Sequence, residues 1–356
     1  MERFEGIELV RYLCMIPGPT GSEERVAEAI VEQLHGIDGI SIKSDKGGNL
    51  IVCYPCGKSD APAIMVSAHM DEVGMMINDI TDDGYIKFAC LGGIDPRVLC
   101  GRHVTLMGEA GDIPGVIASK AIHHQTADER RTATTVDKMY INIGAANKED
   151  ALKHVAIGDS GTFFSDFYTL GSQGKTLCGK AIDDRFGCAA MIEILRNLDE
   201  QKIKLPYDVY FCFTTREEIG LSGAQTAAQS IAPDVSIVLE STAVADIAGV
   251  NETGKVAKQG EGGAISLADR STIYDRGLVD YALEISKTQG IKAQIKKYIS
   301  GGNDAGHIHK SGKGVRALAI SAPTRYLHSA TCVAHADDYE SIKQLVYALL
   351  CGGKLA

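Results

Sequence analysis

Residues 207–230, YDVYFCFTTREEIGLSGAQTAAQS, join a strand-like run to a helix-like run through two adjacent glutamates. The first part is rich in aromatic and β-branched residues, which favours a strand over residues 207–215. The second part, residues 220–230, consists of small and polar residues typical of a helix. Glu217 and Glu218 therefore stand between a strand end and a helix start. At this position the two glutamates could be a solvated surface pair or two carboxylates of a functional site.

The same alternation of strands and helices continues on both sides of this stretch. Helices are predicted at 1–13, 21–36 (with Ser22 as the N-cap), 183–201, 272–290 and 335–352. Strands are predicted at 49–55, 61–74, 234–242, 292–300 and 314–323. Alternating strands and helices predict an α/β fold with a mostly parallel sheet covered by helices on both faces.

Residues 73–167 have a different pattern, with short strand-like runs separated by Gly, Asp and Pro turns. Regular spacing of this kind predicts a small β-barrel or sandwich, interrupted by one helical patch at 147–155. The simplest architecture is an α/β domain of residues 1–70 and 166–356, with a β-rich domain of residues 71–165 inserted into it.

Composition excludes several classes of protein. The 356 residues are 45% hydrophobic and carry a formal net charge of −10, which argues against non-specific binding of nucleic acid. No apolar run is long enough to span a membrane, and the N-terminus lacks the features of a signal peptide. Ten scattered cysteines suit a reducing compartment, so we expect a cytoplasmic protein. Cys53 and Cys56 have redox-motif spacing, but they lie between two strand-like runs, which favours a hairpin.

Five sets of metal-ligand side chains lie at predicted element ends, four at the ends of strands and one at the start of a helix. Each set has an ordinary explanation when taken singly, as a loop hydrogen bond, a helix cap, a solvated pair or a polar loop residue. The residues concerned are His69 with Asp71, Asp183 with Asp184, Glu217 with Glu218, Glu240, and His328.

Taken together, these residues favour a metal site. Ligands of an open α/β sheet bind at the carboxyl ends of its strands, where these side chains are expected to meet. Many carboxylates buried together repel one another unless cations neutralise them. Oxygen and imidazole ligands suit zinc, cobalt or manganese, and two histidines with three or more carboxylates suit two ions bridged by a carboxylate. No glycine-rich nucleotide motif or serine nucleophile elbow is present, so we expect no nucleotide cofactor.

In this order, the motifs resemble those of the dinuclear-metal aminopeptidases, in particular the glutamyl, deblocking and tetrahedral (TET) aminopeptidases. The motifs are His-x-Asp at 69–71, Asp-Asp-Arg at 183–185, Glu-Glu-Ile-Gly at 217–220 and Pro-Thr-Arg-Tyr-x-His-Ser at 323–329. The resemblance covers nearly the whole chain. It implies a zinc-exopeptidase-like fold with a PDZ-like inserted domain that assists dimerisation and assembly, commonly into a homo-oligomer of twelve subunits.

The resemblance also implies a role for each residue of the cluster. Two divalent ions are expected per subunit, zinc foremost, with cobalt or manganese as alternatives. The implied ligands are His69 and Glu240 for one ion, Glu218 and His328 for the other, and Asp183 as the bridge. Glu217 is implied as the general base and Asp71 as the residue that orients His69. The implied reaction releases N-terminal amino acids from short peptides with a free N-terminus, through a water activated by two metals.

Three other readings of the cluster are open. A metal-dependent deacylase of N-acyl amino acids would use similar ligands. A glycosidase would use paired carboxylates, but the chain has no Trp and the histidines would go unexplained. A non-enzymatic scaffold would predict that some ligands are missing. The preferred N-terminal residue is not predicted: Lys255, Lys258 and Arg270 could line a pocket for an acidic side chain, although a solvated basic run is the simpler interpretation.

Overall fold

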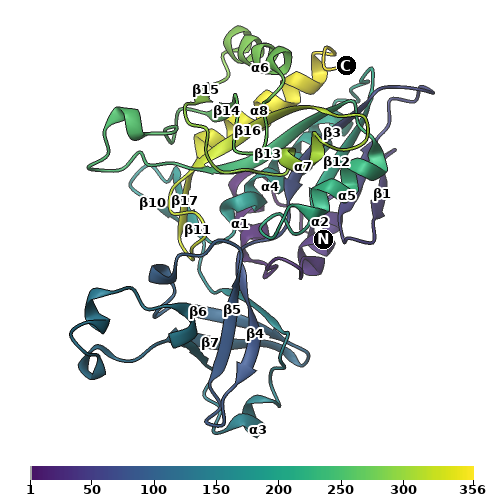
Figure 1. The fold of residues 1–356 in the computed structure, drawn as a ribbon. Coiled ribbons are helices and arrows are strands. Elements are labelled where there is room, and N and C mark those ends of the chain that lie inside the picture. The colour runs from purple at the N-terminus through teal and green to yellow at the C-terminus, as the bar shows by residue number, and fades with distance from the viewer. Residues whose placement is uncertain (1) are drawn as a thin grey trace.

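The computed structural model describes residues 2–356, and its largest element is an eight-stranded sheet (Figure 1). Its strands are β1 (Ser41–Ser44), β2 (Leu50–Tyr54), β3 (Ala63–His69), β12 (Asp208–Thr214), β13 (Val235–Ala243), β14 (Gly263–Ser266), β15 (Ala293–Lys296) and β16 (Arg316–Thr324). Their order in the sheet is β1-β2-β12-β3-β13-β16-β14-β15. The four central strands, β12, β3, β13 and β16, are parallel to one another, whereas β1, β2 and β14 add antiparallel pairings. The predicted mostly parallel sheet is confirmed.

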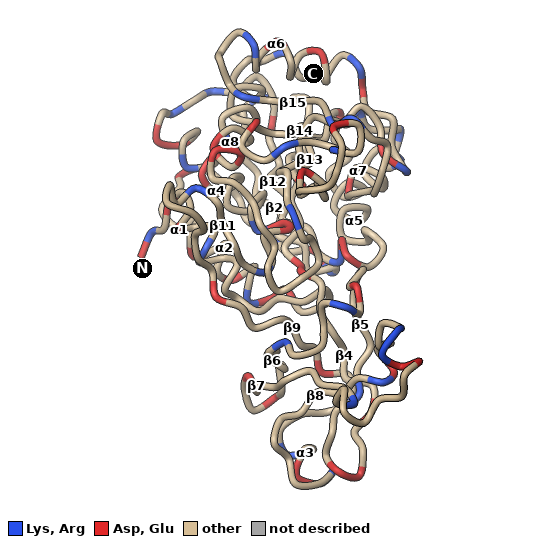
Figure 2. Tube along the Cα trace, turned by 90° about the vertical axis from the view of Figure 1, so that its left-hand side faces the viewer, with Lys and Arg blue, Asp and Glu red and all other residues tan. Residues whose placement is uncertain are grey.

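Helices cover the sheet on both faces, as predicted. The α-helices are α1 (Gly6–Met15), α2 (Glu24–Gln33), α3 (Lys148–Ala151), α4 (Ile182–Glu200), α5 (Ser222–Ile231), α6 (Arg276–Gln289), α7 (Ala305–Ile308) and α8 (Ala336–Cys351). Of these, α3 lies beside the barrel described below and not on the sheet (Figure 1). Helices α4 and α8 pack on each other and on the central strands, and α5 and α7 form a second pair. Figures 1 and 2 show the two pairs on opposite sides of the sheet. Parallel strands covered in this way are buried on both faces, which explains the nearly continuous apolar runs of β3 and β13.

Six further strands close into a small barrel that lies apart from the eight-stranded sheet (Figure 1). They are β4 (Gly74–Ile80), β5 (Ile86–Leu91), β6 (His103–Gly108), β7 (Gly111–Ala118), β8 (Tyr140–Asn142) and β9 (Ser160–Phe163). The barrel has an apolar core of its own, which includes Met75, Leu106 and Ile141. The predicted β-rich unit is therefore a barrel. The division into a catalytic domain (1–70 and 166–356) and an oligomerisation domain (71–165) stays a prediction.

Five strands were not recognised in the sequence, for physical reasons. Strand β4 follows β3 so closely that the apolar run 61–74 looks like a single strand. The other four, β1, β14, β11 (Thr176–Gly179) and β17 (Cys332–His335), have four residues each, too few to show a period. Strands β11 and β17 form a small sheet with β10 (Tyr168–Leu170). The predicted Ser22 cap is wrong, because the N-cap of α2 is Glu23 and the Ser22 hydroxyl bonds to Ser160.

Acidic and basic residues are interspersed over both parts of the molecule (Figure 2). All ten cysteines are free thiols; Cys53 lies in β2 and Cys56 in the turn after it. Among the helices of residues 2–356, none combines the length and the apolar character that crossing a membrane requires.

Candidate metal centre

The parallel strands bring His69 and Glu240 together. His69 is the last residue of β3 and pairs with Thr214, the last residue of β12. The register between β13 and β3 pairs Val238 with Ser67, and two residues further it sets Glu240 beside His69. His69 Nε2 lies 3.4 Å from Glu240 Oε1. These polar side chains therefore meet at the carboxyl ends of the strands, where ligand sites form in open α/β sheets.

Asp183 and Asp184 take different places although they are neighbours. Neither has helical backbone angles, and a cis peptide bond joins them. Asp184 Oδ1 accepts the Gly187 N–H at 3.1 Å, so it caps the regular part of α4. Asp183 Oδ1 lies 3.3 Å from His69 Nε2, and its Oδ2 lies 3.6 Å from His328 Nε2. Asp183 thus faces both histidines, one with each oxygen.

Asp71 holds the backbone of the two glutamates. Its Oδ1 accepts the Glu217 N–H at 3.0 Å and its Oδ2 accepts the Glu218 N–H at 3.1 Å. Because both carboxylate oxygens accept backbone N–H groups, they fix the turn after β12 against the residues that follow β3. Glu218 then extends its side chain to His328, with 3.4 Å between Oε2 and Nε2.

Both histidines have a defined tautomer. His69 Nδ1 lies 3.0 Å from the Asp71 carbonyl oxygen, and His328 Nδ1 lies 3.0 Å from the Gly93 carbonyl oxygen. A carbonyl oxygen can only accept, so each Nδ1 carries the proton. In the neutral ring, Nε2 then offers a lone pair to the carboxylate-lined space, which is the arrangement of a metal-binding histidine.

The five predicted ligands, together with the predicted base Glu217, fall into overlapping groups whose donor atoms lie within 4.8 Å of one another. Each group contains one histidine and two carboxylates. The groups are His69 with Asp183 and Glu240, His328 with Asp183 and Glu218, and His69 with Glu217 and Glu218. Asp183 belongs to both of the first two groups.

The electrostatics of this cluster indicate an excess of negative charge. Burial opposes protonation of His69, but the nearby Glu240 and Asp183 carboxylates outweigh it and raise the pKa of His69 well above 6.5. Burial and Asp183 together raise the pKa of Glu240 well above 4.5 and that of Glu218 to about 7. Burial alone would raise the pKa of Asp183, yet hydrogen bonds from the two histidines lower it well below its usual range. Carboxylates crowded in this way are stabilised by cations.

Three residues near the cluster were not singled out as site residues. Asp304, only 1% exposed, accepts a hydrogen bond from Thr214 Oγ1 at 2.6 Å, and burial raises its pKa to about 7. It ends the Gly-Gly-Asn-Asp run at 301–304. The sequence did not indicate Gly93 or Glu72 as site residues. Gly93 contacts His328 through its backbone carbonyl and Glu72 forms a buried ion pair, and neither kind of contact leaves a pattern in a sequence.

The basic residues Lys255, Lys258 and Arg270 do not join the cluster. Lys255 Nζ and Lys258 Nζ lie 2.6 and 3.0 Å from the two carboxylate oxygens of Glu252. Arg270 is exposed, and its backbone N–H bonds to Gly301. The simpler interpretation as a solvated basic run fits these contacts.

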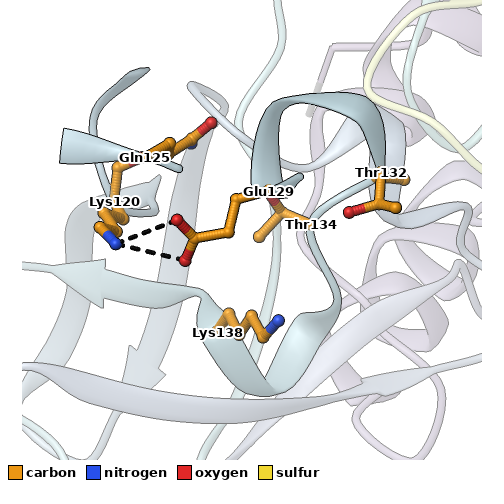
Figure 3. A pocket seen from close by; sticks show the side chains of 7 residues that line it. Lys120, Gln125, Glu129, Thr132, Thr134 and Lys138 are labelled. Carbon is orange, nitrogen blue, oxygen red and sulfur yellow. Dashed lines mark hydrogen bonds and ion pairs between the residues drawn. The ribbon is translucent and has the colours of Figure 1, made fainter. Parts of the chain in front are cut away.

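Two cavities differ in what they offer chemically. A small one beside the cluster is lined by Glu72, Val73, Phe163, Ala181, Asp183, Glu218, His328, Ser329 and Cys332. A larger one, of about 380 Å³, lies on the barrel (Figure 3), where Lys120 Nζ and Glu129 Oε2 are 3.1 Å apart. It is lined mostly by exposed side chains and contains none of the predicted site residues. The chemistry therefore points to the small cavity.

Known proteins are similar to this chain over nearly its whole length. The family described as M42 glutamyl aminopeptidase matches residues 48–345. A putative aminopeptidase from Acetivibrio thermocellus is 35% identical over 352 residues, covering 99% of this chain and 100% of the relative. The structure of a TET aminopeptidase from a marine-sediment Thaumarchaeota archaeon has a TM-score of 0.92 and 34% identity, covering 97% of this chain and 95% of that one. The Pyrococcus horikoshii TET1 peptidase, which can assemble into a tetrahedron or a large octahedral shell, has a TM-score of 0.85 and 35% identity, covering 97% and 98%.

Proposed function

Because this chain belongs to the M42 glutamyl aminopeptidase family and is a metal-dependent aminopeptidase, we propose that its carboxylate and histidine cluster holds two divalent cations that act together in peptide hydrolysis. One observation carries the proposal: Asp183 presents its two oxygens to two histidines that lie in separate groups of possible ligands. A carboxylate in that position suits a bridge between two ions.

The residues present fit such ions. Seven carboxylates surround only two imidazoles; they are Asp71, Asp183, Asp184, Glu217, Glu218, Glu240 and Asp304. Glu240 Oε2 is buried and has no hydrogen-bond partner. A buried carboxylate oxygen of this kind is costly unless a cation or a proton satisfies it. His69 and Glu240 would hold one ion, Glu218 and His328 the other, and Asp183 both.

Divalent cations held by these ligands would supply Lewis-acid chemistry, which polarises a scissile carbonyl and lowers the pKa of water. Glu217 takes the proton of the attacking water and passes it to the leaving amine. Asp71 positions Glu217 through the backbone N–H, so the base stays beside the ligands. Carboxylates of the cluster also offer an ionic partner to a free α-amino group, which restricts cleavage to the N-terminal residue.

The cofactor and the assembly follow the family. Zinc is the first choice for the two ions, and cobalt and manganese are the alternatives, because oxygen and imidazole ligands suit all three. The related TET peptidase structures are assemblies. We therefore propose a homo-oligomer built from dimers, twelve subunits in all, with the barrel as the assembling domain. A cytoplasmic location stays a prediction.

Removal and return of the metal test this function. Chelation should abolish release of amino acids from aminoacyl-nitroanilides and short peptides, and zinc, cobalt or manganese should restore it. Acetylated amino acids and a nitrophenyl glycoside serve as substrates for the rival deacylase and glycosidase. Unchanged peptide turnover after verified metal removal, or faster turnover of either rival substrate, would contradict the proposal.

A further inference from the structure

A buried ion pair lies behind the metal-ligand cluster. Lys180 Nζ and Glu72 Oε1 are 2.6 Å apart, and the side chains of Lys180 and Glu72 are only 4% and 2% exposed. Glu72 lines the small cavity together with Asp183, Glu218 and His328. Neither Lys180 nor Glu72 has been given a role in holding a cation or moving a proton.

The pair joins the two segments that carry His69 and Asp183. Glu72 comes three residues after His69, and Lys180 comes three residues before Asp183. The backbone of Glu72 is fixed by two hydrogen bonds. Its N–H donates to the Gly18 carbonyl and its carbonyl accepts the Thr20 N–H, both at 3.0 Å. Its Oε1 also accepts the Gly18 N–H at 3.2 Å. Lys180 is thus anchored to a rigid acceptor.

A second buried cation anchors the other side of Asp183. Arg185, two residues after it, is fully buried and donates from Nε to the Met70 carbonyl. Its Nη1 donates to the Leu13 carbonyl at 2.7 Å. Asp183 therefore stands between two cationic side chains, each fastened to the segment that follows His69.

Stability alone does not explain this arrangement. Taking charges out of water is costly, and a buried ion pair is often no more stabilising than apolar residues of the same volume. Geometry is a better reason, because a bridging ligand must hold its two oxygens in place within a fraction of an ångström. Lys180 Nζ meets that need, because it donates to two fixed acceptors, Glu72 Oε1 at 2.6 Å and the Ile16 carbonyl at 3.4 Å.

We propose that the Lys180–Glu72 ion pair is a positioning device that sets Asp183 relative to His69, and so sets the separation of the two cation sites. This inference depends on one part of the proposed function, namely that Asp183 binds a cation. Lys180 and Glu72 act through Asp183 and touch neither the cation nor the peptide.

The test measures cation binding without any substrate. Cobalt is titrated calorimetrically into the metal-free full-length protein, and into Lys180→Met and Glu72→Gln. Both variants should bind cobalt about 10–100-fold more weakly than the wild type, the range known for residues that orient metal ligands. Lys180→Arg keeps the charge and should bind more tightly than Lys180→Met. Thermal unfolding of the metal-free proteins is followed by circular dichroism in parallel.

Lys343→Met is the matched control. Lys343 Nζ lies 3.3 Å from Glu193 Oε2, and both side chains are nearly buried, at 14% and 12% exposure. Glu193 lies in the regular part of α4, eight residues after Arg185 and so about 12 Å further along the helix. This variant should lose stability and keep the cobalt affinity of the wild type.

The outcomes separate this inference from the proposed function. Wild-type cobalt affinity in Lys180→Met or Glu72→Gln would overturn the positioning role, and so would an equal loss of affinity in Lys343→Met. If Lys180→Met does not fold, Glu72→Gln and Lys180→Arg decide in the same way. A wild-type protein that binds cobalt but hydrolyses no peptide would contradict the proposed function. The cobalt affinities of the variants would still test the positioning role in that case.

Discussion

The Gly93 carbonyl oxygen lies 3.0 Å from His328 Nδ1, although the two residues are 235 positions apart in the chain. Gly93 belongs to the loop that follows β5 of the barrel, and His328 follows β16 of the sheet. The barrel therefore selects the tautomer of a predicted metal ligand in the α/β unit. In that tautomer, Nε2 is free to face Asp183 and Glu218.

Gly93→Ala should weaken cation binding from the barrel side. A Cβ on Gly93 would lie 3.3 Å from His328 Nδ1, so the ring or the loop must move by a few tenths of an ångström. We expect about a tenfold loss of cobalt affinity in calorimetric titration, which is the low end for a partner of a ligating histidine. An unchanged affinity with an unchanged fold would show that the loop does not orient His328.

Glu217→Gln and Glu218→Gln should have opposite signatures. Glutamine at 217 cannot take a proton, so the turnover rate should fall about 10²–10⁴-fold while two cobalt ions still bind. Glutamine at 218 weakens the group shared with His328, so cobalt affinity should fall. Glu28→Gln, at an exposed position on α2, is the control for both. Loss of a cation in Glu217→Gln would make Glu217 a ligand, which its place in the third group of possible ligands also allows.

Asp71→Asn should loosen the turn that carries both glutamates. An amide has one acceptor oxygen where the carboxylate has two, so either the Glu217 N–H or the Glu218 N–H loses its buried partner. We expect the free energy of unfolding to fall by about 1–3 kcal/mol. Cobalt affinity should fall about 10–100-fold.

Asp338→Asn provides the matched control for Asp71→Asn. Asp338 is equally buried, and its two oxygens accept the N–H groups of Gly260 and Gly262 at 2.9 and 2.7 Å. This variant should lose comparable stability with no change in cobalt affinity. Equal loss of affinity in both variants would mean that Asp71 acts only through general stability.

Asp338 also predicts a pH dependence of stability. Burial raises its pKa from 3.8 to about 6 in the folded protein. The folded state then binds this proton more tightly than the unfolded chain does, so the stabilisation is complete below pH 4 and declines as the pH rises to 6. The stability of the wild type relative to Asp338→Asn should fall over this range by up to about 3 kcal/mol, measured by thermal unfolding at several pH values. A difference that is constant or rises with pH would contradict the shift.

The fold could be predicted because its signals are local. Runs such as residues 207–215 and 234–242 show their burial directly, and the helices show an apolar period. Short strands such as β11 and β17 could not be predicted, because four residues have no recognisable period and pairing with distant partners creates them. Strand β4 could not be predicted as a separate strand either, because the apolar run continues from β3 and only the change of chain direction after His69 separates the two.

The sequence by itself determined which residues are candidates for the chemistry, because a polar residue at the end of a buried strand is visible as a break in an apolar run. Only the tertiary structure decided which contacts each of these residues makes. Asp183 and Asp184 look alike in the sequence, yet one faces two histidines and the other caps a helix. The reason is that a side chain's surroundings are set by segments far away in the chain. Such contacts are those of Gly93 with His328 and of Lys180 with Glu72, which strand register and chain packing create and residue order alone does not contain.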